Sequence, residues 1–78
     1  MKPVGELIEE KLSTAINNHK NRKFEAAEKL YKEILSLDQS NSEAIFHLGT
    51  LYSQLKKFSQ AKHLLLKADE LNPNNLNI

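Results

Sequence analysis

The feature that most constrains this chain is an internal period of about 34 residues. Identical residues recur at this spacing, as in the pairs Phe24 and Phe58, Ala27 and Ala61, Leu30 and Leu64, Leu37 and Leu71, and Asn41 and Asn75. A period of this length is typical of repeat architectures, in which one supersecondary unit is copied and stacked on itself. The chain is therefore predicted to hold two copies of one unit.

Each copy reads as a pair of helices. The chain has two Gly, two Pro and few β-branched residues, which favours an all-α fold. Apolar residues recur at helical spacing over about 4–20, 24–37, 45–55 and 58–71. Ser40, three residues before Glu43, is a candidate capping box for the third helix. The prediction is four main helices arranged as two helix–turn–helix hairpins.

Gly49 indicates how one pair packs. It interrupts the apolar stripe of Ile45, Leu48 and Tyr52, and a Gly inside a helix costs about 1 kcal/mol relative to Ala. A close approach by the next helix would justify that cost, with small residues of that helix, Ala61 and Ala68, supplying the approaching face. The full set of small residues predicted to serve packing is Ala15, Ala27, Gly49, Ala61 and Ala68.

The second unit resembles the tetratricopeptide repeat. The matching residues are Ile45 in the usual Trp position, Leu48-Gly49, Tyr52, Ala61, Ala68 and Pro73. The first unit departs from the pattern at Lys11, Thr14, Asn18, Ile34 and Gln39. The resemblance implies a fragment of a right-handed α-solenoid, forming a single domain over 1–78. Its repeats would cover about 8–41 and 42–75, with a polar tail at 74–78.

The resemblance also implies a concave groove lined by the first helix of each unit. Its expected residues are Glu9, Leu12, Ile16, His19 and Lys20 from the first unit, and Glu43, Phe46, His47, Thr50, Ser53 and Gln54 from the second. An alternative is that Leu12, Ile16 and Phe46 complete a small core instead. Family members that grip a chaperone's terminal carboxylate place Lys and Asn where this chain has Leu12, Ile16 and His47, so that specificity is not expected here.

The last helix is expected to leave apolar surface uncovered. In a longer array a following helix would cover Leu64, Leu65, Ala68 and Leu71. Exposed apolar patches usually indicate association. The expectation is either a homodimer that buries these faces or a segment of a longer array.

The sequence does not favour catalysis, a cofactor or a metal. There is no Cys and no Gly-rich loop, and the one candidate pair of ligands or acid–base groups, His19 and His47, is better explained as polar groove lining. With a net charge of +1, nucleic-acid binding is not expected. The basic turns are the one feature that would favour a phosphate backbone or an acidic partner; they hold Lys20, Arg22, Lys23, Lys56 and Lys57.

The predicted function is therefore protein–protein interaction through the groove, without catalysis. Acidic residues near the N-terminus argue against a signal peptide, and the longest aliphatic run, Leu64 to Leu66, is too short for a membrane span, so a cytoplasmic protein is expected. Two alternatives remain. In the first, the chain is the N-terminal repeat segment of a larger transferase-type enzyme. In the second, it is a self-assembling scaffold.

Overall fold

The computed structural model describes residues 2–72, which form four helices and no strand. The helices are α1 (Val4–Lys20), α2 (Phe24–Leu37), α3 (Ser42–Gln54) and α4 (Phe58–Leu71). The predicted all-α class with two hairpins is confirmed. The tail predicted at 74–78 and the family position at Pro73 lie outside the described residues. Within residues 2–72, none of the helices combines the length and the apolar character that crossing a bilayer requires.

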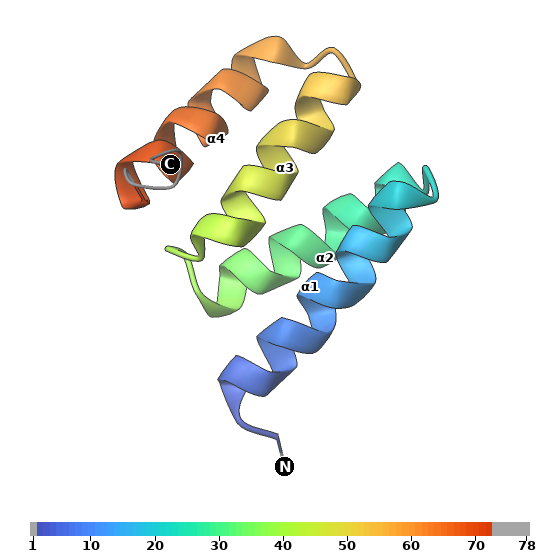
Figure 1. The fold of residues 1–78 in the computed structure, drawn as a ribbon, viewed down its shortest axis with the longest axis vertical. Coiled ribbons are helices and arrows are strands. Elements are labelled where there is room, and N and C mark those ends of the chain that lie inside the picture. Colours follow the sequence, from blue (N-terminus) through green and yellow to red (C-terminus); the bar gives the residue numbers. More distant parts are fainter. Residues whose placement is uncertain (1, 73–78) are drawn as a thin grey trace, which may run out of the picture.

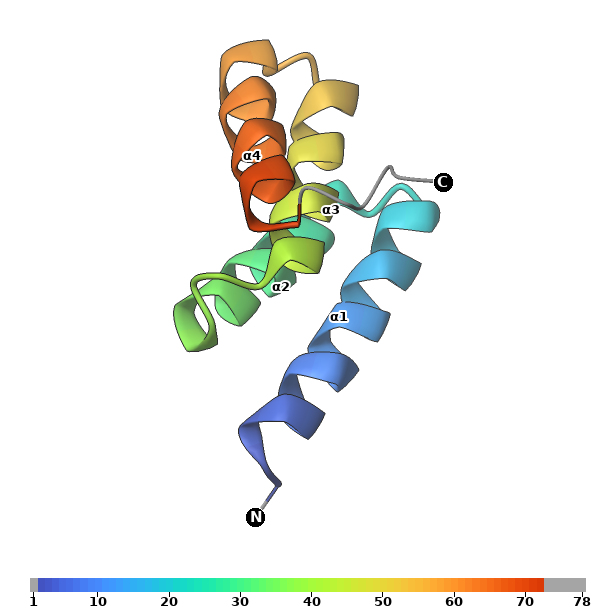
Figure 2. The same ribbon diagram turned by 60° about the vertical axis from the view of Figure 1, so that its left-hand side comes forward.

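The helices form two antiparallel pairs joined through α3. α1 packs against α2, and α3 packs against α4 (Figure 1). α3 also lies against α2 and touches α1, so it covers the inner side of the first hairpin (Figure 2). No helix among residues 2–72 covers the second hairpin in the same way.

The turns inside the two hairpins have the same backbone. Arg22 and Lys56, which occupy equivalent positions in the two units, both adopt a left-handed conformation with φ of 63°. The hydrogen bonds also correspond: Lys23 N–H to Asn18 O and Arg22 N–H to His19 O in the first turn, and Lys57 N–H to Tyr52 O and Lys56 N–H to Ser53 O in the second. This is the Schellman pattern, which satisfies the last carbonyls of a helix. The sequence period is therefore reproduced in the backbone.

The start of α3 differs from the prediction. Asn41 caps the helix, because its side-chain oxygen accepts a hydrogen bond from Ala44 N–H at 2.9 Å. Ser40 was the predicted cap, but its backbone N–H donates instead to Asp38 Oδ1 at 3.2 Å. Ser40 therefore belongs to the turn, and the capping position falls one residue later.

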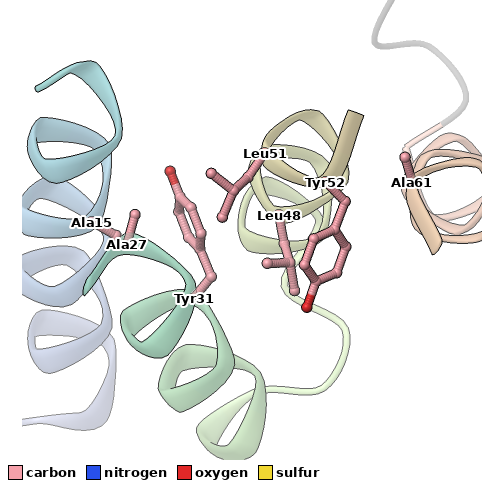
Figure 3. Packing of buried hydrophobic residues seen from close by; sticks show 7 residues of the cluster. All are labelled: Ala15, Ala27, Tyr31, Leu48, Leu51, Tyr52 and Ala61. Carbon is pink, nitrogen blue, oxygen red and sulfur yellow. The ribbon is translucent and has the colours of Figure 1, made fainter. Parts of the chain in front are cut away.

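The core lies where α3 meets the first hairpin. Tyr31 of α2 is fully buried and stands between the small residues Ala15 and Ala27 on one side and Leu51 of α3 on the other (Figure 3). Ile34, also fully buried, packs with Ile8 and Ala44 in a second cluster. The burial of α2 therefore depends on α3 as well as on its own partner α1.

The five small residues predicted to serve packing are all buried: Ala15, Ala27, Gly49, Ala61 and Ala68. The close approach at Gly49 comes from other side chains than predicted. A Cβ at Gly49 would lie 2.9 Å from Leu65 Cδ2 and 3.3 Å from Leu64 Cβ. Leu64 and Leu65, rather than Ala61 and Ala68, thus form the surface next to Gly49. The close approach to the glycine is thus made by the larger side chains of α4.

The outer side of α1 is polar at the positions where α3 is apolar. Lys11, Thr14 and Asn18 of the first unit are the equivalents of Ile45, Leu48 and Tyr52, which are all buried. Lys11 Nζ is instead paired with Glu33 Oε1 of α2 at 2.8 Å. The two ends of the stack therefore have different surface chemistry.

Candidate functional site

The candidate site is a hollow between the C-terminal half of α1 and the facing side of α3, which we call the α1–α3 groove. Its lining residues are Ile16, His19, Lys20, Arg22, Phe24, His47 and Gln54. The Schellman turn after α1 brings Arg22 and Phe24 back beside the end of that helix. Three separate segments of the chain thus meet at one place.

His19 holds these segments together. Its Nδ1 lies 3.1 Å from the Tyr31 hydroxyl, and its Nε2 is hydrogen-bonded to Gln54 Oε1. An amide oxygen only accepts, so Nε2 donates this bond, and Nδ1 shares a hydrogen bond with the Tyr31 hydroxyl. Burial raises the pKa of Tyr31 to about 12, which keeps this hydroxyl protonated at neutral pH. The imidazole therefore links α1, α2 and α3 at the floor of the groove.

His47 adds an uncharged ring next to this network. It stacks on Tyr31 with the ring centroids 5.9 Å apart and the planes 6° apart. Burial, followed by the positive charge that His19 can carry, lowers the pKa of His47, although Glu43 opposes the shift. The neutral form is thus favoured at neutral pH, and His47 presents an aromatic surface rather than a charge.

The positive charge of the groove comes from its rim. Lys20 is exposed, and the Arg22 guanidinium carbon lies 5.6 Å from the centroid of the Phe24 ring. Cations over an aromatic face are attracted to it, so the arginine is positioned rather than free. The lining residues include two cations and no carboxylate. This arrangement suits a ligand with an apolar part and a negative charge.

The groove does not bring together a set of metal ligands. Both ring nitrogens of His19 are engaged by neighbours, so neither offers a free lone pair. Across residues 2–72, no three His, Cys, Asp or Glu side chains gather where they could hold a metal. The chemistry available here is recognition through hydrogen bonds, aromatic surface and charge.

The remaining residues predicted to line the groove lie in different places. Phe46 and Ser53 face α4 and line a second, apolar hollow, which we call the α4 hollow; it also includes Phe58, Ala61, Lys62, Leu65, Leu66, Ala68 and Asp69. Leu12 packs against both core clusters. Glu9 and Glu43 are exposed, and the Thr50 hydroxyl donates to the Phe46 carbonyl at 3.0 Å. The predicted set is thus divided among the groove, the α4 hollow, the core and open surface.

Two residues that line the groove, Arg22 and Phe24, were not predicted to do so. Arg22 was assigned to a basic turn, and Phe24 was noted only as a residue that recurs in both units. Their contribution follows from the tight turn after α1, which places the start of α2 beside His19. The ring of Phe24 lies 5.9 Å from that of His19, and the ring of Tyr31 lies 6.1 Å from it.

The basic turns are close together but are not purely basic. Arg22, Lys23 and Lys57 line one shallow surface that also holds the carboxylates Glu25 and Glu28. A hydrogen bond from Tyr52 at 2.6 Å, opposed by partial burial and assisted by Lys32, lowers the pKa of Glu28. This surface therefore has mixed charge, which weakens the case for a phosphate backbone.

A comparison with known protein families finds a match. The model of the family described as tetratricopeptide repeat matches residues 19–78, which is more than half of the chain. The match begins at His19 and so leaves most of α1 outside. That helix carries Lys11, Thr14 and Asn18, the residues at which the first unit departs from the family pattern.

Proposed function

Because the chain belongs to the tetratricopeptide repeat family, whose repeats are generally protein-interaction modules, we propose that it binds a protein segment in the α1–α3 groove and catalyses no reaction. The observation that carries this proposal is the His19 network. One imidazole, hydrogen-bonded to both Tyr31 and Gln54, links three helices around the groove. Binding surfaces that are already ordered lose less entropy when a ligand binds.

The lining of the groove supports a particular kind of partner. Ile16 and Phe24 offer apolar surface, and Lys20 and Arg22 lie on the rim beside them. A bound segment with an apolar side chain next to an acidic one would bury the apolar side chain against Ile16 and Phe24. Its acidic side chain would pair with Lys20 or Arg22. Charge-assisted hydrogen bonds to Lys and Arg would then fix the orientation of the segment. We therefore propose an acidic, partly apolar segment of another protein as the ligand.

The test uses a random peptide library displayed on phage and selected against the immobilised chain. Sequences with Asp or Glu beside an apolar residue are expected to be enriched. The same sequences should lose binding to Lys20→Glu and to Arg22→Glu, because both changes place like charges against the acidic group.

Phe46→Ala is the matched control. Phe46 belongs to the α4 hollow, so this variant should keep the selected peptides. The proposal would be contradicted if Lys20→Glu and Arg22→Glu bound the selected peptides as well as the wild type does. Selection of peptides without acidic residues would also contradict it.

A further inference from the structure

The two hairpins differ most at the α4 hollow. In the first hairpin α3 covers Tyr31 and Ile34, which are fully buried. The equivalent positions in the second hairpin are Leu65 and Ala68, and they line the open α4 hollow. At its edge Phe58 is 62% exposed and Leu66 is 55% exposed. The α4 hollow thus corresponds to the face of the first hairpin that packs against α3, but no helix among residues 2–72 covers it.

Charges at the two ends of this surface indicate what would cover it. Lys62 and Asp69 both line the α4 hollow, and both are exposed. They are seven residues, or about two helical turns, apart on the same face of α4. Neither takes part in the ion pairs found among residues 2–72. Leu65 and Leu66 lie midway between them, so the apolar centre is flanked by one charge of each sign.

We propose that this face binds a second copy of the chain, with the two α4 helices antiparallel about a two-fold axis near Leu65 and Leu66. In that arrangement Lys62 of each copy faces Asp69 of the other, because the two positions are equally far from the axis. A two-fold interface must be self-complementary. A face with an apolar centre and opposite charges at equal distances on either side meets that condition.

The opposite end of the molecule argues against a head-to-tail stack. Such a stack would place α1 of one copy on the α4 hollow of the next, where α3 lies in the first hairpin. The positions of α1 that would enter the hollow are Lys11, Thr14 and Asn18 instead of apolar residues. Burying unpaired polar groups is unfavourable. The two-fold pairing avoids that penalty and closes at two chains.

The test is a charge exchange measured by sedimentation equilibrium on the full chain, from about 1 µM to about 1 mM. The wild type is expected to go from one chain to two over this range. Lys62→Asp alone and Asp69→Lys alone place like charges opposite each other twice per dimer, so each should weaken the dimer by more than about tenfold. The double variant K62D/D69K and an equimolar mixture of the two single variants should both recover it, since each restores opposite charges.

Lys67→Asp is the matched control, since Lys67 is exposed on α4 but does not line the hollow. It should leave the dimer unchanged, and circular dichroism should show equal helix content in all variants. A wild type that is monomeric up to about 1 mM would overturn the proposal and leave a helix of another protein as the occupant. Species that grow beyond two chains, or single variants that pair as well as the wild type, would also overturn it. These outcomes do not bear on the α1–α3 groove, because Lys62 and Asp69 lie outside it.

Discussion

The two hairpins share a period, a turn conformation and several identical residues, yet two pairs of equivalent positions are buried to different degrees. Phe24 is half-buried in the first hairpin, whereas its counterpart Phe58 is mostly exposed in the second. Tyr31 is fully buried, whereas its counterpart Leu65 is only half-buried. The difference comes from α3, which covers one hairpin and belongs to the other. Burial at these two pairs of positions is thus set by the neighbouring unit more than by the hairpin itself.

The strongest test of this comparison is to remove equivalent side chains from the two hairpins. Tyr31→Ala should lower the free energy of unfolding by about 3–5 kcal/mol, because it empties the centre of the core and leaves His19 Nδ1 without its hydrogen-bond partner. Leu65→Ala should cost only about 1–2 kcal/mol, since half of that side chain is already in water. Urea unfolding followed by circular dichroism measures both. Equal losses would mean that α3 does not cover the first hairpin as described.

The close contact at Gly49 can be tested against the other glycine. Gly49→Leu should destabilise the chain by about 1–3 kcal/mol, because even a Cβ there lies 2.9 Å from Leu65 Cδ2. Gly5 has no atom within 4 Å of an added Cβ, so Gly5→Leu should leave stability unchanged or raise it slightly. Thermal melts of the two variants provide the measurement. An unchanged melting temperature for Gly49→Leu would contradict the close packing of α4 against Gly49 of α3.

The cap of α3 matters because this helix belongs to both packing interfaces. Asn41→Ala removes the acceptor of the Ala44 N–H and should cost about 1 kcal/mol. Ser40→Ala should have almost no effect, since the Ser40 contact in the turn uses its backbone. Chemical denaturation of the two variants distinguishes them. If the Ser40 variant lost more stability, the helix would begin as the capping-box pattern predicted.

The smallest expected effect is a pH dependence carried by His47. Its folded-state pKa is below the ordinary value of 6.5, so the unfolded chain takes up a proton first as the pH falls. The free energy of unfolding should therefore decrease as the pH falls below about 6.5 and be restored as the pH rises again. His47→Gln should flatten this part of the curve. Glu28, whose pKa is lowered from 4.5, contributes a separate loss only at more acidic pH.

Helix positions were predictable because they follow from spacing along the sequence. Apolar residues at helical intervals located α1, α2 and α4 at the residues where the structure has them. The turns were less predictable, since Arg22 and Lys56 adopt a conformation that usually signals itself by Gly. The preceding helix and the packing of the hairpin impose that conformation, and no local residue preference reveals it.

The candidate site was only partly predictable for a similar reason. Spacing indicates which residues share a helix face, and so His19 and His47 were placed on the faces that meet. It does not indicate where a neighbouring helix will lie, which is why Phe46 and Ser53 proved to face α4. The contribution of Arg22 and Phe24 required the path of the turn. The surface of a repeat protein depends on the angles between its helices, and these angles cannot be read from the repeat period of the sequence.

The polar outer side of α1 makes lengthening of this molecule a one-directional process. A duplicate of residues 42–71 joined after α4 would find Leu65 and Ala68 ready to receive it, much as Tyr31 and Ile34 receive α3. The same duplicate inserted ahead of α1 would meet Lys11, Thr14 and Asn18 and leave its own apolar side in water. Gene duplication, or an engineer adding modules, would thus extend the array only toward its carboxyl side.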